Sequence, residues 1–357
     1  MSRYSRQIVL QEIGLAGQEK LLNASVLCVG AGGLGSPALL YLAAAGVGRI
    51  GIVDFDVVDK TNLQRQTLFT TEQIGESKAQ AAKLRLESLN PEIEIRAYVE
   101  ELNQDNAQSL FKNYDIIIDA VDNFSTKFLI NDAGIKIGKP VIYGAISGYD
   151  GFVSVFGARN GPCYRCLISK SPSGHIQNCA EAGVIGAVAG NVGTVQAMEA
   201  IKLILNHENF TLLVGKVWMI DMQSMQSKVL SLAKDPKCPT CSKEKNEIIL
   251  SYSSPICKNI QEATFEQVEK NADAIIIDVR ELEEWEAGHI EEARHLPLSI
   301  LEKQERIFDF PKSSEIFLYC HSGKRSKKAL EIITAKGYSN SYSLIGGYQA
   351  WLESQTL

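Results

Sequence analysis

Apolar positions in the first part of the chain alternate between short continuous runs and stretches with helical spacing. The runs at 25–30, 49–54 and 115–119 predict buried strands, and the stretches at 36–45 and 78–89 predict helices. Strands that alternate with helices in this way form a mainly parallel sheet with helices on both faces. The pattern therefore predicts an α/β domain.

A second α/β pattern occupies roughly the last hundred residues. It contains runs typical of strands at 274–279 and 315–319, and a helical stretch at 324–336. Polar clusters with several prolines precede it, as expected of a boundary between domains. We predict a first domain at 1–245, a linker at 246–257 and a second domain at 258–357.

Composition and charge exclude some classes of protein. The chain has 357 residues, 45% hydrophobic and 22% charged, which is typical of a globular protein. The net charge of -6, without a long basic run, argues against nucleic acid as a partner. We expect no signal peptide, no membrane span and a cytoplasmic location. The most apolar stretch, 184–205, fits a buried helix because polar residues interrupt it at Asn191, Gln196, Glu199 and Lys202.

A glycine-rich turn, Gly30-Ala-Gly-Gly-Leu-Gly35, directly follows the first predicted strand. Glycines there let the backbone approach a phosphate, and the next helix presents free N–H groups to it. Asp54 ends the second strand, where it can accept hydrogen bonds from a ribose. The turn predicts an adenine nucleotide, and by itself it leaves NAD and ATP open.

Charged residues beyond the turn favour ATP over NAD. Arg65, Lys78 and Asp122 all follow predicted strand ends, which is where open α/β sheets bind ligands. Cleavage of a triphosphate requires cations at the phosphates and a carboxylate for Mg²⁺. Hydride transfer requires neither, so we expect Mg-ATP. Each of these charges, taken singly, is more simply a solvated surface residue.

The eight cysteines are expected to be reduced in the cytoplasm, where they serve as metal ligands, reactive thiols or core residues. Two Cys-x-x-Cys pairs have the spacing that lets two thiolates bind one metal. Redox pairs are the alternative interpretation. The proline-flanked pairs favour one structural Zn²⁺ site made of Cys163, Cys166, Cys238 and Cys241.

Another cysteine, Cys320, follows a predicted strand and begins a short loop that ends at Arg325. Such a loop directs backbone N–H groups inward, and with the arginine it would stabilise an anionic sulfur. Cysteine phosphatases use a longer loop to hold a phosphate. Four residues between Cys320 and Arg325 favour a persulfide instead.

The first 245 residues resemble the MoeB and ThiF family of ubiquitin-activating-like adenylyltransferases. The resemblance rests on RYSRQI, GAGGLG, VDFDVVDKTNLQRQ, DAVDN and PCYRCL. It implies a Rossmann-like ATP-binding domain with zinc knuckles, in which Asp122 also binds Mg²⁺. It also implies a homodimer in which Arg6 reaches the phosphates of the neighbouring subunit. The implied ATP-binding residues are Gly33, Asp54, Thr61, Asn62, Leu63, Gln64, Arg65, Lys78, Asp122 and Asn123.

Cys179 lies in a motif, NCAEAG, that in this family carries a cysteine linked to transfer onto the carrier protein. The resemblance implies a catalytic role for Cys179, and the alternative is a small residue at a helix start. Residues 258–355 are similar to rhodanese domains, with landmarks DVRE, GHI and ARHLP besides the Cys320 loop. That resemblance implies a small α/β sulfurtransferase domain in which Cys320 carries a persulfide.

Together the two resemblances imply an enzyme that adenylates the C-terminal glycine of a small ubiquitin-like sulfur carrier ending in Gly-Gly. Cys320, loaded by a cysteine desulfurase or thiosulfate, would then supply sulfur to form a thiocarboxylate. Molybdopterin and thiamine biosynthesis are the implied pathways. The alternatives are an adenylating enzyme for a small molecule or tRNA, and a nucleotide-sensing module whose rhodanese part only docks partners.

Overall fold

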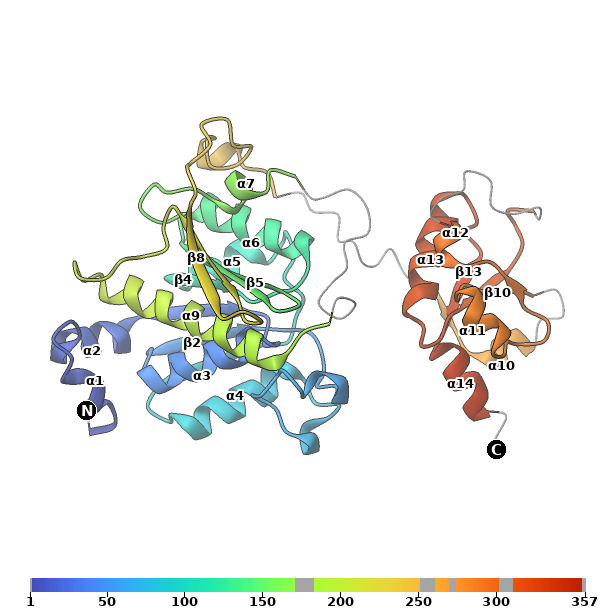
Figure 1. Ribbon diagram of the computed structural model, residues 1–357, viewed down its shortest axis with the longest axis horizontal. Helices are drawn as coiled ribbons and strands as arrows, with labels where there is room; N and C mark the ends of the chain where they lie inside the picture. The colour runs from blue at the N-terminus through green and yellow to red at the C-terminus, as the bar shows by residue number, and fades with distance from the viewer. Residues whose placement is uncertain (1, 171–182, 251–260, 270–273, 302–310, 355–357) are drawn as a thin grey trace. The chain divides into compact units, whose positions relative to one another are not determined.

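The computed structural model describes residues 2–170, 183–250, 261–269, 274–301 and 311–354. The chain divides into two compact units, Met1–Ser254 and Pro255–Leu357 (Figure 1). Each unit has its own sheet and its own hydrophobic core, and each is described separately below.

An eight-stranded sheet forms the centre of the first unit. Its first five strands in spatial order are parallel, as the sequence predicts, and the last three continue the sheet in antiparallel fashion. The strands are, in spatial order, β3 (Glu94–Tyr98), β2 (Arg49–Val53), β1 (Ser25–Val29), β4 (Ile116–Asp119), β5 (Val141–Ser147), β6 (Asp150–Phe156), β7 (Lys216–Asp221) and β8 (Gln226–Ser231).

Alternation along the central strands explains why helices cover both faces of this sheet. In β1, Val26 and Cys28 enter one core, and Leu27 and Val29 enter the other, because successive side chains point to opposite faces. Helices α3, α4 and α9 pack on the first core, and α5, α6 and α7 on the second (Figure 1). The helices are α1 (Ser5–Ile8), α2 (Gly14–Asn23), α3 (Gly35–Ala45), α4 (Lys78–Leu89), α5 (Ala107–Lys112), α6 (Phe124–Ile137), α7 (Tyr164–Leu167) and α9 (Gly186–Leu205), with 3₁₀ turns at Ser2–Tyr4, Lys60–Asn62, Thr71–Gln73 and Lys245–Glu247.

The apolar stretch at 184–205 forms α9, which packs against α3, β5 and β6. Gln196 is fully buried there, and its Nε2 donates to the carbonyl oxygens of Asp119 and Ile142. Among the described residues, none of the helices combines the length and the apolarity that crossing a bilayer requires. The prediction of a buried helix is therefore confirmed.

The second unit contains a five-stranded sheet that is parallel throughout. Helices α12 and α13 pack on one core, and α10 and α14 pack on the other. The strands are β11 (Arg294–His295), β10 (Ile275–Asp278), β12 (Ile316–Tyr319), β13 (Ser341–Leu344) and β9 (Glu262–Ala263), in spatial order. The helices are α10 (Phe265–Glu269), α11 (Leu282–Glu286), α12 (Leu298–Leu301), α13 (Lys324–Ala335) and α14 (Gly347–Ser354).

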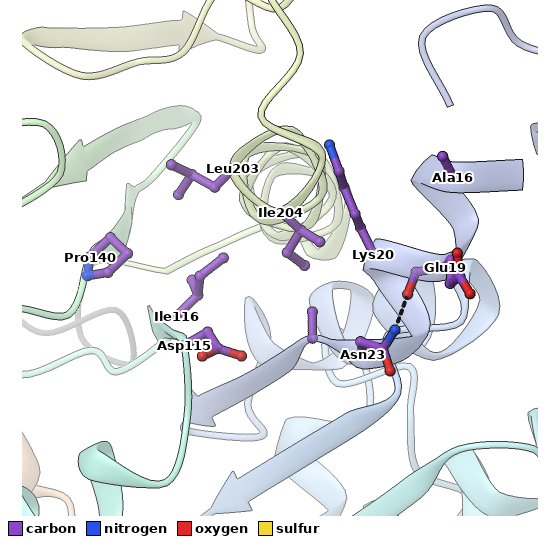
Figure 2. Close-up of a pocket in the computed structure, with 10 residues that line it drawn as sticks. Ala16, Glu19, Lys20, Asn23, Asp115, Ile116, Pro140, Leu203 and Ile204 are labelled. Carbon is purple, nitrogen blue, oxygen red and sulfur yellow. Dashed lines mark hydrogen bonds between the residues drawn. The ribbon is translucent and has the colours of Figure 1, made fainter. Parts of the chain in front are cut away.

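A hollow of about 710 Å³ lies at the amino ends of β1, β4 and β5, where Ala24, Ile116 and Pro140 line it (Figure 2). Nζ of Lys20, which also lines the hollow, donates to the carbonyl oxygen of Leu205 at the end of α9. Ligands of open α/β sheets bind at the opposite edge, outside the carboxyl ends of the strands. The glycine turn and the charged residues that the sequence singles out lie at those carboxyl ends.

Candidate functional site

The glycine turn between β1 and α3 requires glycine for steric reasons. Gly30 has φ +92°, and a Cβ on Gly35 would lie 2.0 Å from the carbonyl oxygen of Gly30. Asp54 closes the turn because its Oδ2 accepts from the Ala31 N–H at 2.7 Å, while its Oδ1 accepts from the Asp56 N–H at 2.9 Å. Burial raises the pKa of Asp54, and these N–H groups and the charge of Lys78 oppose that rise.

Arg65 lies against the glycine turn. A Cβ on Gly33 would lie 3.5 Å from Cγ of Arg65, and the guanidinium donates to the carbonyl oxygen of Thr61 at 3.3 Å. The loop is held locally, since Asp59 accepts from the Thr61 N–H and Oδ1 of Asn62 accepts from Gln66. The structure therefore brings the Arg65 side chain against a glycine turn that lies about thirty residues earlier in the sequence.

Two further predicted residues of this loop have different surroundings. Leu63 is partly buried and packs against the first core, whereas Gln64 is exposed. A Cβ on Gly186, the first residue of α9, would lie 2.4 Å from the Gln64 carbonyl oxygen. The amino end of α9 therefore packs closely against the backbone of the loop.

Lys78 is a buried cation at the same edge of the sheet. Its side chain is 6% exposed, and Nζ lies 2.9 Å from Oδ2 of Asp56, just beyond the end of β2. Asp56 was not predicted as a site residue. Its signal in the sequence is the spacing of Asp54, Asp56 and Asp59 after a strand. Asp56 holds Lys78 and also donates its N–H to Asp54.

Asp122 and Asn123 follow β4, the other neighbour of β1. Asp122 is exposed, and the Asn123 side chain caps α6 by accepting from the Thr126 N–H at 2.9 Å. β1, β2 and β4 are adjacent and parallel. Their carboxyl ends therefore place the glycine turn, the Asp54–Lys78 group and Asp122 along one edge of the sheet.

A buried ion pair that the sequence did not reveal lies beneath this edge. Nζ of Lys127, in α6, lies 3.0 Å from Oδ1 of Asp119 and 2.7 Å from the carbonyl oxygen of Gly144. Burial raises the pKa of Asp119, and the charge and hydrogen bond of Lys127 oppose the rise. The pair ties the end of β4 to α6 and so supports the turn that carries Asp122 and Asn123.

Two predicted catalytic residues are not placed by these contacts. Arg6 is exposed on α1, and no hydrogen bond or ion pair joins it to the described residues around the glycine turn. Cys179 lies outside the described residues. Their roles stay predictions.

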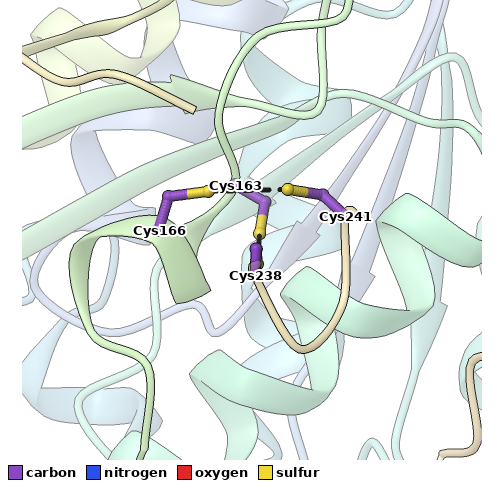
Figure 3. A group of neighbouring side chains, drawn as sticks. All are labelled: Cys163, Cys166, Cys238 and Cys241. Carbon is purple, nitrogen blue, oxygen red and sulfur yellow. Dashed lines mark hydrogen bonds between the residues drawn. The ribbon is translucent and has the colours of Figure 1, made fainter. Parts of the chain in front are cut away.

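The four cysteines of the two Cys-x-x-Cys pairs converge, as the sequence predicts (Figure 3). Sγ of Cys163 lies 3.5 Å from Sγ of Cys238, Sγ of Cys166 lies 3.5 Å from Sγ of Cys241, and all four sulfurs are within 4.8 Å of one another. Zinc–sulfur bonds of about 2.3 Å in a tetrahedron place sulfurs about 3.8 Å apart. The four thiols are free, and their spacing fits a structural Zn²⁺ site. This arrangement favours a metal site over redox disulfides.

One carboxylate outside the cluster holds both cysteine pairs. Asp132, in α6, accepts from Nε and Nη2 of Arg165, which lies between Cys163 and Cys166. Its Oδ1 also accepts from the Thr240 hydroxyl at 2.9 Å, and Thr240 lies between Cys238 and Cys241. Asp132 therefore fixes the distance between the two pairs.

Asp132→Asn is expected to release Zn²⁺ about tenfold faster than the native chain, because groups that orient metal ligands contribute about 10- to 100-fold to metal affinity. The asparagine weakens the double contact with the Arg165 guanidinium. Chelator-driven zinc release, followed with a colorimetric indicator, measures the effect. Thr240→Ser, which keeps the hydroxyl, is the control. Equal release rates in Asp132→Asn and the native chain would contradict this role.

In the second unit, Cys320 follows β12 and lies at the centre of a cradle of donors. Its Sγ accepts from the N–H groups of Gly323 and Arg325, both at 3.2 Å, and from the Ser326 hydroxyl at 3.8 Å. The residue is 1% exposed. Three hydrogen-bond donors therefore converge on this one sulfur.

The guanidinium of Arg325 forms an ion pair with Glu284, in α11. Nη1 and Nη2 of the guanidinium both donate to the carboxylate, and Nη2 lies 2.7 Å from Oε1. This contact holds the pKa of Glu284 below its ordinary value. Glu284 was not predicted from the sequence. A signal is available, since a glutamate in a helix just after a strand end faces the same edge of the sheet as the Cys320 loop.

Comparisons with known proteins agree with this geometry. The ThiF family model matches residues 4–240, and the rhodanese-like domain model matches residues 263–354. A Mycobacterium tuberculosis protein named probable adenylyltransferase/sulfurtransferase MoeZ is 38% identical over 364 residues, which cover 98% of this chain and 92% of that protein. The Anopheles gambiae adenylyltransferase and sulfurtransferase MOCS3 is 35% identical, with 99% of this chain and 87% of that protein covered.

Two more comparisons concern the first unit. A Thermus thermophilus protein named sulfur carrier protein adenylyltransferase is 45% identical over 253 residues, covering 69% of this chain and 93% of that protein. A crystal structure of Escherichia coli MccB with ATP matches with a TM-score of 0.58 at 23% identity, covering 68% of this chain and 75% of that chain. The latter shows a shared fold. The chain belongs to the ThiF family of adenylyltransferases and carries a C-terminal rhodanese-like domain.

Proposed function

We propose that this chain is an adenylyltransferase and sulfurtransferase that converts the C-terminal carboxylate of a ubiquitin-like sulfur carrier into a thiocarboxylate. The observation that carries the proposal is that one chain holds both a glycine turn with Arg65 and the buried Lys78 at the same end of the sheet, and a cysteine in a cradle of N–H donors. Relatives that are named for both activities align over nearly its full length.

In the first step, the carrier's terminal carboxylate attacks the α-phosphorus of ATP. A carboxylate–phosphorus bond forms, the bond to the β-phosphate bridge breaks, and pyrophosphate leaves. The attacking carboxylate is already ionised at neutral pH, so this step requires no general base. It requires relief from repulsion between anions, which Arg65 and Lys78 supply as cations. Magnesium would reduce the charge of the phosphates, and we assign its ligand to Asp122.

In the second step, the outer sulfur of a persulfide on Cys320 attacks the activated acyl carbon, and AMP leaves. The product is an acyl disulfide with Cys320. Attack by a thiolate on the Cys320 sulfur then releases the thiocarboxylate and leaves a disulfide, which an external thiol must reduce. Cys179 is our candidate for that thiolate, or for an earlier acyl intermediate.

The chemistry of the carrier follows from the reaction. A tail that ends in Gly-Gly has no side chains near its carboxylate, so it can lie close to the glycine turn. The homodimer in which Arg6 serves the neighbouring subunit, and a role in molybdopterin, thiamine or a related sulfur pathway, belong to the same proposal. The Porphyra purpurea probable molybdopterin-synthase adenylyltransferase, which is 36% identical over an alignment that covers 99% of this chain, supports the first pathway.

Mass spectrometry of a carrier ending in Gly-Gly, incubated with the chain, ATP, Mg²⁺ and a sulfur donor, tests the proposal. The expected product is the carrier with one oxygen replaced by one sulfur. A carrier without its last two glycines is the control and should stay unmodified. If the complete mixture yields neither an acyl adenylate nor a thiocarboxylate, the proposed substrate class is wrong.

A further inference from the structure

The ion pair between Arg325 and Glu284 has no part in the chemistry above. It lies beside the reactive sulfur, since the backbone N–H of Arg325 donates to Sγ of Cys320 at 3.2 Å while its guanidinium binds Glu284. The two side chains are 34% and 36% exposed. The pair is therefore accessible to anything that approaches the Cys320 loop.

The two charges hold each other in a defined position. The contact is bidentate, and bidentate arginine–carboxylate pairs have a more specific geometry than single contacts. A carboxylate at this place offsets the positive charge of the Arg325 guanidinium. Two more cations among the described residues of this unit are also paired, since Arg280 binds Asp278 and Lys327 binds Glu262.

We propose that Glu284 is a specificity determinant that selects the sulfur donor. By occupying Arg325, it disfavours thiosulfate, a small dianion, and favours a protein that presents sulfur as a cysteine persulfide. The inference rests on the proposed sulfurtransferase function and narrows its donor to one class.

The charge balance of the two loading reactions explains the selection. With thiosulfate, the Cys320 thiolate attacks the outer sulfur, the S–S bond breaks, and sulfite leaves as a dianion. Thiosulfate therefore approaches, and sulfite leaves, as a dianion that is repelled by the negative charge of Glu284. With a protein persulfide, the same thiolate attacks the terminal sulfur and a single cysteine thiolate leaves. The second reaction has one negative charge less near Glu284 and should depend less on a free Arg325.

Glu284→Gln in the full chain tests the proposal. Formation of the Cys320 persulfide is measured by mass spectrometry, with thiosulfate or with a cysteine desulfurase supplied with cysteine. We expect kcat/KM for thiosulfate to rise about tenfold, mainly through KM and less so at high salt, because a partly exposed charge is screened. The rate with the desulfurase should change by less than about twofold.

Two control variants separate charge from other effects. Glu283→Gln removes the same charge from the adjacent, exposed residue of α11 and should leave both rates unchanged. Glu284→Asp keeps the charge and should leave the preference for the protein donor in place. An unchanged or reduced kcat/KM for thiosulfate in Glu284→Gln would overturn the proposal. Failure of the native chain to form a persulfide with either donor would instead refute the sulfurtransferase function itself.

Discussion

Replacing Lys78 by methionine should slow carrier-dependent exchange of pyrophosphate into ATP by about 100- to 1000-fold. That is the usual loss when one group that stabilises transition-state charge is removed from an enclosed site. The methionine side chain can occupy the same buried space as the aliphatic part of the lysine. It carries no charge at the position of Nζ, which lies 2.9 Å from Asp56 in the native chain. Incorporation of labelled pyrophosphate into ATP measures the effect.

Lys83→Met is the matched control, because Lys83 is on the same helix, is 36% exposed at its side chain and pairs with Glu87 at the surface. It should exchange at the native rate. The unfolding midpoint of Lys78→Met should stay close to the native one, since Asp56 is 54% exposed and can be solvated. Native exchange rates in a folded Lys78→Met chain would show that the phosphates bind elsewhere.

Cys320→Ser should abolish thiocarboxylate formation and leave adenylation intact. The hydroxyl keeps acceptors for the N–H groups of Gly323 and Arg325, so the loop should fold as before. A hydroxyl cannot carry a persulfide, and the loss of transfer should therefore be complete. The carrier should remain as its adenylate, which mass spectrometry detects together with undiminished pyrophosphate exchange.

Ser322→Ala, a change at an exposed position of the same loop, is the control and should transfer sulfur normally. Thiocarboxylate made by Cys320→Ser at the native rate would mean that another group delivers the sulfur. A loss of pyrophosphate exchange in the same variant would mean that the two activities are not separable in this chain.

Local sequence patterns predicted much of the fold, because helices and buried strands are specified largely by residues that are neighbours in sequence. The helix at 78–89 and the central parallel strands are confirmed almost to the residue. The antiparallel strands β6, β7 and β8 were missed. β6 and β7 pair across a long insertion that contains α9. β8 is exposed throughout, so it has no apolar run to reveal it.

For the candidate sites, too, local patterns identified some residues and missed others. The cysteines of the Cys-x-x-Cys pairs and the glycines of the turn were identified because few local structures require those residue types at those spacings. The structure brings the four cysteines together, as predicted. The supporting charges Lys127, Asp132 and Glu284 were missed because a charged residue in a helix usually faces solvent. Asp132 and Glu284 pair with arginines 33 and 41 residues away along the chain, and Lys127 pairs with Asp119 eight residues before it.

Because Cys320 is buried, its Sγ and the outer sulfur of its persulfide differ in accessibility. Its own Sγ is enclosed, since the residue is 1% exposed, and a second sulfur would extend about 2 Å beyond it. The outer sulfur of the loaded enzyme therefore lies farther out than Sγ of the unloaded residue. Alkylating agents should then modify the persulfide form of Cys320 faster than the unloaded form.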